Sequence, residues 1–314
     1  MLPKPLKHGD TVGVIAPASP PNIENYKKSI AFIESFGLSI QEGKHLKNVH
    51  GYLAGTDDER LEDLHDMFAD DSIKGIIFAG GGYGTARIAH RLDYELIKKN
   101  PKIFWGYSDL TYLHTAIRQE TGLVTFHGPM LASDVGKEDF HPLSKKQFNQ
   151  LFEPTFLVYD ESIAPLEVIA EGKAEGEIVG GNLTLIASSL GGQYELDTKG
   201  KLLLIEDVDE EPYRIDGYLA QLMHAGKLEE AAGIIVGDFN NAVPTRNPSL
   251  SLETVLDDYF RQLGKPVMKG FQIGHCQPHF AIPLGTRARL STESKTLTIQ
   301  PGVTGSSNDS ESRL

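Results

Sequence analysis

The sequence contains one cysteine, no long apolar run and no cluster of basic residues. A single cysteine cannot form a disulfide within the chain, and so few cysteines exclude a zinc-ribbon framework. The first apolar run, residues 12–16, is too short for a signal peptide or a membrane span. Lys and Arg number 30 against 43 Asp and Glu, so the net charge is −13 and nucleic-acid phosphates would find no basic patch. We expect a cytoplasmic protein with neither nucleic acid nor membrane as a partner.

What the sequence does contain is the composition of a globular protein. Hydrophobic residues make up 40% of the 314, and 32 glycines come in addition. This composition excludes disorder, a collagen-like repeat or a coiled coil as the main architecture. We expect about two domains, because a typical domain has roughly 150 residues.

The first half of the chain alternates short apolar runs with helical patterns. Thr56 followed by Glu59 is a capping box that opens one of these helices. Strands separated by helices predict βαβ units and a parallel sheet, here in an N-terminal α/β domain over residues 1–152. The expected strands are 11–17, 74–79, 102–105 and 123–126, and the expected helices are 23–36, 56–70, 85–92 and 109–122.

The second half begins after residues 153–172, where the helical pattern lapses and two prolines occur. We interpret this segment as a linker to a C-terminal α/β domain over 173–304, followed by a disordered tail at 305–314 that is rich in Ser, Asn, Asp and Glu. The expected strands are 177–179, 201–205, 233–236 and 267–273, with helices at 183–190, 213–224 and 252–263 and a hairpin at 287–291 and 295–300.

Ser108 lies where a predicted strand turns sharply into a helix, in the segment Gly106-Tyr-Ser-Asp109. A serine at such a turn presents its hydroxyl outward, and the helix amides beside it can hold an oxyanion. This is the arrangement of a nucleophile elbow, although Leu110 stands where the usual motif has glycine. The alternative is that Ser108 or Asp109 only caps the helix, which is a common role of both residue types.

A serine nucleophile needs a base and a group to orient that base. Glu206 follows a strongly apolar strand, at the sheet edge where α/β proteins bind ligands. His275 follows another strand, with His127 and His279 as competing candidates. The acidic residues after Glu206 also leave open a solvated loop or a divalent-metal site, but their spacing fits no EF-hand loop.

The segment Ala79-Gly-Gly-Gly-Tyr-Gly-Thr85 forms a glycine-rich turn between a strand and a helix. Its backbone N–H groups could bind a phosphate or a developing oxyanion. It lacks the Walker A lysine and the dinucleotide fingerprint. It resembles the GGDGT loop of NAD and diacylglycerol kinases, but Tyr83 replaces the aspartate. Cys276 has no elbow glycines around it, and we expect it to be a small buried residue.

Seven segments in this order resemble the serine LD-carboxypeptidase family, the muramoyltetrapeptide carboxypeptidases and their relatives. The resemblance runs from residue 13 to about residue 285. The segments are Gly51–Arg60, Gly81–Gly84 with Arg87, Gly106–Asp109, His127–Pro129, Gly180–Leu183, Leu204–Asp207 with Glu211–Asp216, and Gly274–His275.

The resemblance implies a catalytic triad of Ser108 as nucleophile, His275 as general base and Glu206 as the residue that orients it. It places the oxyanion hole on backbone N–H groups. The hole residues are Asp109, Gly81 and Gly82, and the expected substrate-binding residues are Tyr83, Asn182 and Arg87. One departure concerns substrate specificity: Gly80 stands where relatives have an arginine before the glycine turn.

The fold that the resemblance implies is a flavodoxin-like, doubly wound N-terminal domain with a C-terminal α/β domain of swivelling type, commonly as a homodimer. The implied activity is release of the terminal D-Ala from murein tetrapeptides in peptidoglycan recycling, without a metal or cofactor. The alternatives are a microcin C-type immunity peptidase acting on an aminoacyl-nucleotide, a GGDGT-type nucleotide kinase, and a non-catalytic binding module. We expect the nucleophile to come from the first domain, and Glu206 and His275 from the second.

Overall fold

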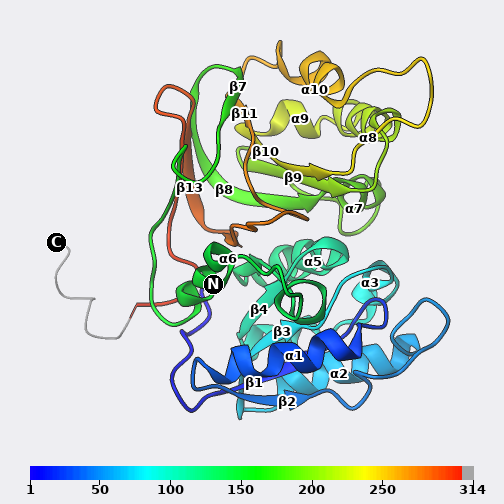
Figure 1. Cartoon of the computed structure of the whole chain (residues 1–314), viewed down its shortest axis with the longest axis vertical. Helices are drawn as coiled ribbons and strands as arrows, with labels where there is room; N and C mark the ends of the chain where they lie inside the picture. Colours follow the sequence, from blue (N-terminus) through cyan, green and yellow to red (C-terminus); the bar gives the residue numbers. More distant parts are fainter. Residues whose placement is uncertain (306–314) are drawn as a thin grey trace. The chain divides into compact units, whose positions relative to one another are not determined.

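The computed structural model describes residues 1–305, which fold into two compact units (Figure 1). Unit 1 comprises Met1–Thr155, Ala281–Pro283 and residues 301–305, and unit 2 comprises Phe156–Phe280 and Leu284–Gln300. Of the predicted tail, residues 306–314 lie outside the described part of the chain. Within residues 1–305, no helix combines the length and the apolar character needed to cross a membrane.

Unit 1 is built on a six-stranded sheet with the order β12-β5-β4-β3-β1-β2, in which β2, β1, β3, β4 and β5 are paired in parallel. The order 2-1-3-4-5 is that of flavodoxin-like folds, so the expected parallel sheet is confirmed. The strands are β1 Thr11–Ile15, β2 Ser39–Glu42, β3 Ile73–Phe78, β4 Ile103–Gly106, β5 Thr125–His127 and β12 Ile282–Leu284.

The helices of unit 1 follow the predicted alternation, and the capping box at Thr56 is present with both of its reciprocal hydrogen bonds. The α-helices are α1 Ile23–Glu34, α2 Asp57–Ala69, α3 Thr85–Ile88, α4 Tyr94–Lys99, α5 Thr111–Thr121 and α6 Pro142–Lys146. The short helical segments are η1 Ala89–Arg91, η2 Ser108–Leu110, η3 Leu131–Val135 and η4 Gln147–Leu151.

The core of unit 1 fixes the strand that leads to Ser108. Every residue of β4 is buried, as expected for a parallel strand covered on both faces. Trp105 in this strand is fully buried, its ring lies 4.5 Å from that of Phe148, and its indole N–H donates to the carbonyl of Pro129 at 2.7 Å. The end of β4 is therefore held both by packing against Phe148 and by a buried hydrogen bond to Pro129.

Unit 2 contains a mixed eight-stranded sheet with the order β6-β14-β13-β8-β9-β10-β11-β7. Strands β8 to β11 are parallel, whereas β13, β14, β6 and β7 pair antiparallel. The strands are β6 Leu157–Tyr159, β7 Glu167–Ala170, β8 Lys173–Asn182, β9 Leu202–Val208, β10 Gly233–Asn240, β11 Val267–Lys269, β13 Arg287–Ser291 and β14 Thr296–Ile299. The helices are α7 Leu183–Ser188, α8 Pro212–His224, α9 Lys227–Glu230 and α10 Leu252–Phe260.

The chain is divided differently from the sequence-based expectation. The segment 153–172, predicted to be a linker, carries β6 and β7 as part of the sheet of unit 2. Residues 281–283 and 301–305 belong to unit 1, whereas the sequence-based prediction assigned residues 281–283 and 301–304 to the second domain and residue 305 to the tail. Strands β6, β7 and β12 have three or four residues each, which are too few for the alternation of apolar and polar side chains to be recognised.

Candidate active site

Ser108 has the backbone of a nucleophile elbow. It follows β4 by two residues, its φ is +64°, and η2 leads from it directly into α5. A left-handed backbone at a residue other than glycine costs on the order of 1–3 kcal/mol and persists only where the surroundings enforce it. Neither η2 nor α5 has a side-chain cap: Leu110 is the N-cap of α5, and the Asp109 carboxylate accepts from the amide of Thr85.

The glycine turn lies against this serine. A Cβ added to Gly81 would lie 3.1 Å from Ser108 Cβ and 3.4 Å from its hydroxyl oxygen, so the absence of a side chain at 81 allows the approach. Ser19 holds the turn, because its amide donates to the Gly81 carbonyl at 3.1 Å and its hydroxyl accepts from the Tyr83 amide at 3.1 Å. Gly82 has a φ of +112°. The turn thus brings backbone groups to the nucleophile.

Glu206 and His275 meet in unit 2 as expected. Glu206 is fully buried near the end of β9, and its Oε2 lies 2.8 Å from Nδ1 of His275. Gly274 permits this contact: its φ is +131°, and an added Cβ would lie 2.8 Å from the same Oε2. A carboxylate at Nδ1 holds the proton on that nitrogen and leaves Nε2 to accept a proton, which is the role of the carboxylate in serine hydrolases.

Two further carboxyl groups lie near the pair. Burial, followed by the negative charge of Glu206, raises the pKa of Asp207 to about 6 and that of Asp238 to about 6. Asp207 accepts hydrogen bonds from the amide of Thr184 at 2.9 Å, from its hydroxyl at 2.8 Å and from the side chain of Asn182 at 3.0 Å. The positive charge of His275 opposes the rise in the pKa of Asp238.

The three expected substrate-binding residues have different surroundings. Asn182 is buried, where it caps α7 through the amide of Leu185 at 3.2 Å and donates to Asp207. Arg87 makes two hydrogen bonds of 2.9 Å to the carboxylate of Asp57. Tyr83 is 54% exposed. Of the three, Tyr83 presents the most open side chain.

The competing residues are placed less favourably. His127 and His279 are fully buried, whereas the His275 side chain is 17% exposed and bound to a carboxylate. Cys276 is partly exposed rather than buried as we expected, and its thiol donates to the carbonyl of Pro278 at 3.3 Å. Phe271, Ile273 and Phe280 in the same loop fill the buried positions, whereas the residues around Cys276 stay partly exposed.

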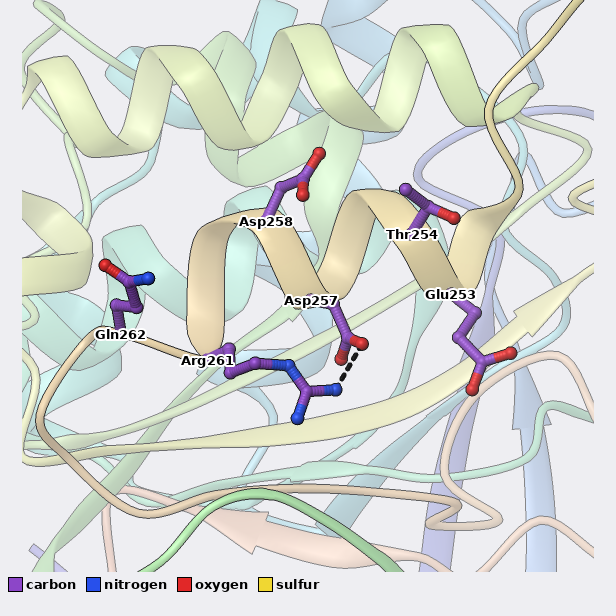
Figure 2. Close-up of a pocket in the computed structure, with 6 residues that line it drawn as sticks. All are labelled: Glu253, Thr254, Asp257, Asp258, Arg261 and Gln262. Atoms are coloured by element: carbon purple, nitrogen blue, oxygen red, sulfur yellow. Dashed lines mark hydrogen bonds and ion pairs between the residues drawn. The ribbon is translucent and has the colours of Figure 1, made fainter.

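No predicted site residue lines the pocket drawn in Figure 2, a shallow hollow of about 510 Å³ along α10 in which Arg261 pairs with Asp257. Its lining residues are Glu253, Thr254, Asp257, Asp258, Arg261 and Gln262. Among residues 1–305, no group of three or more His, Cys, Asp or Glu side chains is arranged to hold a metal ion, the acidic segment after Glu206 included.

Comparison with known proteins identifies the family. Residues 12–128 match the model of the LD-carboxypeptidase N-terminal domain, and residues 175–290 match that of the C-terminal domain. The chain belongs to the serine LD-carboxypeptidase family. It is therefore a hydrolase of the serine peptidase class. This excludes two of the alternative functions, the GGDGT-type kinase and the non-catalytic binding module.

The relatives match over nearly their whole length. A probable murein peptide carboxypeptidase of Bacillus subtilis is 58% identical over 302 residues, which cover 96% of this chain and 95% of the relative. The murein tetrapeptide carboxypeptidase of Pseudomonas aeruginosa is 30% identical over 291 residues, with 89% and 92% covered. An MccF-like protein of Bacillus anthracis has a TM-score of 0.86 at 28% identity, with 95% and 99% covered.

Sequence reasoning missed two groups that shape this carboxypeptidase's candidate site. Ser19 binds the glycine turn, and Asp238 lies near the His275–Glu206 pair. Ser19 could have been found, because it follows β1 and the carboxyl ends of neighbouring parallel strands meet at one edge. Asp238 could not have been found in the sequence, because its raised pKa depends on burial beside Glu206, which no local pattern indicates.

Gly81→Ala is expected to lower kcat strongly while the protein stays folded. The new Cβ would press on Ser108, whose backbone is already strained, and a misplacement of about 1 Å can cost on the order of 100-fold in rate. Turnover and the melting temperature measure the two effects. The matched control is Gly217→Ala in α8, where an added Cβ meets nothing within 4 Å. Wild-type turnover in Gly81→Ala would show that the close approach of residue 81 to Ser108 is not needed for activity.

Asp238→Asn is expected to stabilise the protein above neutral pH and much less in acid. The pKa of Asp238 rises from 3.8 to about 6 on folding, so its contribution to stability is fully present below pH 3.8 and is lost as the pH rises through about 6. Asparagine cannot ionise and avoids this loss. Urea unfolding of both proteins between about pH 4 and pH 8 tests the prediction; a stability difference that does not change with pH would contradict it.

Proposed function

We propose that the protein is a serine LD-carboxypeptidase that releases the terminal D-Ala of murein tetrapeptides. The observation that carries the reaction type is the 2.8 Å contact between His275 Nδ1 and the buried Glu206, the base half of a serine-hydrolase triad. The substrate is supported by the 58% identity to a protein named a probable murein peptide carboxypeptidase.

In the proposed reaction, Ser108 attacks the carbonyl between the L-centre of diaminopimelate or lysine and the terminal D-Ala. His275 Nε2 takes the proton of the serine hydroxyl and returns it to the leaving amine of D-Ala. Glu206 holds the imidazole in the required tautomer and stabilises its positive charge. Water then attacks the acyl-enzyme ester, with His275 again as the base, and frees the shortened peptide and Ser108.

The proposed oxyanion hole consists of the backbone N–H groups of Asp109 and of the turn at Gly81 and Gly82. The approach of Gly81 to Ser108 supports this assignment, because the carbonyl under attack must lie beside the serine oxygen. Each such donor contributes on the order of 3 kcal/mol to the stabilisation of the transition state. Side chains, backbone amides and water suffice for the proposed steps.

For substrate binding we propose a direct contact for Tyr83 and indirect roles for the two other expected residues. The ring of Tyr83 is exposed two residues beyond Gly81, which favours contact with the peptide. Arg87 would act by holding Asp57, and Asn182 by holding Asp207, since their hydrogen bonds go to these carboxylates. Gly80 leaves the substrate without the arginine that relatives carry at this position.

We further propose that the enzyme acts in the cytoplasm on recycled muropeptides, as a homodimer, without nucleic-acid or membrane partners. The net charge of −13 and the short apolar runs support the last two points. The homodimer rests on the family resemblance alone.

A second candidate function is hydrolysis of a microcin C-type aminoacyl-nucleotide. The TM-score of 0.86 to the MccF-like protein favours it, because the same fold would serve both reactions. The identity to that protein is 28%, against 58% to the Bacillus subtilis relative, so we place the murein peptide first. Parallel assays with a murein tetrapeptide and an aminoacyl sulfamoyl nucleotide distinguish the two.

Ser108→Ala is expected to abolish D-Ala release from a murein tetrapeptide, because no oxygen nucleophile remains at the elbow. Glu206→Gln is expected to lose most of the rate, since a neutral amide cannot stabilise the imidazolium. Mass spectrometry of the peptide before and after incubation measures both. The control is Ser188→Ala, a change of a hydroxyl that donates within α7. Full activity of Ser108→Ala would refute the proposed nucleophile, and unchanged turnover of Glu206→Gln would remove Glu206 from the triad.

A further inference from the structure

The two parts of the proposed oxyanion hole come from different segments of unit 1. Gly81 and Gly82 follow β3, whereas Asp109 follows β4 and Ser108. Donors to an oxyanion must lie about 2.7–3.1 Å from it, so the two segments need a fixed separation. The two segments follow neighbouring parallel strands, β3 and β4, but the strand pairing ends at Ile77 and Trp105, before either segment begins. Noncovalent contacts between the two segments must therefore set it.

Asp109 and Thr85 supply such contacts in a reciprocal pair. Oδ2 of Asp109 accepts from the amide of Thr85 at 2.9 Å, and the Thr85 hydroxyl donates to the carbonyl of Asp109 at 2.6 Å. Thr85 is fully buried and Asp109 is 2% exposed, so water does not compete for these groups. Thr85 lies three residues after Gly82 and opens α3. The pair thus ties the end of the glycine turn to the residue after the nucleophile.

A buried arginine, Arg60, also holds the residue that precedes Thr85. Arg60 is 1% exposed and donates to the carbonyl of Gly84 at 3.0 Å and to that of Pro17 at 2.6 Å. Burial raises the pKa of the Asp109 carboxyl, while the bonds from Thr85 and the charge of Arg60 oppose that rise. A carboxylate held this deeply needs such partners, since an unpaired buried charge is costly.

We propose that the Asp109 carboxylate and the Thr85 hydroxyl are positioning groups that fix the spacing between the Asp109 amide and the amides of Gly81 and Gly82. The inference rests on the proposed role of these amides in the oxyanion hole. It assigns to the side chain of Asp109 a task separate from that of its backbone. Neither side-chain group touches the reacting atoms; both act through the backbone that they hold.

The test is Thr85→Val, which removes the hydroxyl and keeps the amide and the side-chain volume. We expect kcat for D-Ala release to fall about tenfold to 100-fold with KM changed less than about twofold, because donor spacing matters in the transition state rather than in substrate binding. The rate at which a fluorophosphonate labels Ser108 is expected to fall in parallel, since the phosphonyl oxygen would occupy the same donors.

Two further variants separate positioning from a loss of folding. Asp109→Asn keeps an oxygen acceptor for the Thr85 amide and is expected to retain more of kcat than Asp109→Ala. Thr115→Val is the matched control: Thr115 is also buried, and its hydroxyl also donates to a carbonyl, that of Thr111 at 3.0 Å, within α5. It is expected to keep kcat and the labelling rate at wild-type values. Melting temperatures identify any variant that is not folded.

The proposal is overturned if folded Thr85→Val matches Thr115→Val in kcat and labelling rate, or if only KM changes. It is also overturned if Asp109→Asn is no more active than Asp109→Ala. The labelling rate needs no peptide substrate, so it tests the positioning pair even if the wild-type enzyme releases no D-Ala. A wild-type enzyme without D-Ala release would refute the proposed function instead.

Discussion

The left-handed backbone at Ser108 is the constraint around which the candidate site of unit 1 is built. Its cost, on the order of 1–3 kcal/mol, has to be offset by the packing around it. The buried strand β4 ends at Gly106, whose carbonyl lies 2.8 Å from Nε2 of His114, and burial lowers the pKa of that histidine to about 3, which keeps it neutral. Gly81 approaches from the other side. These contacts hold the backbone beside Ser108, which would keep the proposed nucleophile in place before substrate binds.

Unit 2 gathers several carboxyl groups around the proposed general base. Glu206 is fully buried and bound to His275, and its charge contributes to the raised pKa values of Asp207 and Asp238. Neighbouring negative charges destabilise the folded state, and such clusters are common in active sites. Asp207 is compensated by hydrogen bonds from Asn182 and Thr184, which belong to the start of α7. Asp207, the first acidic residue after Glu206, is thus part of β9 and not of a solvated loop.

Much of this could be predicted from the sequence, because the relevant signals are local. The capping box of α2, the hairpin of β13 and β14 and the parallel order of unit 1 follow from caps, turns and hydrophobic runs. The pairing of Glu206 with His275 was implied by the family resemblance, because their positions after two strands left His127 and His279 open as alternatives. The short strands β6, β7 and β12 gave no pattern, because edge pairing depends on distant partners. The reciprocal bonds of Asp109 and Thr85 likewise join residues 24 apart that no local motif connects.

The central claim is that Ser108 is the nucleophile and that His275, oriented by Glu206, activates it. The most direct test is to treat the wild-type enzyme with a fluorophosphonate, digest it and locate the label by mass spectrometry, alongside His275→Ala. The account predicts a single label on Ser108, formed far more slowly in the variant. A label on another residue, or equal labelling of Ser108 in both proteins, would contradict it.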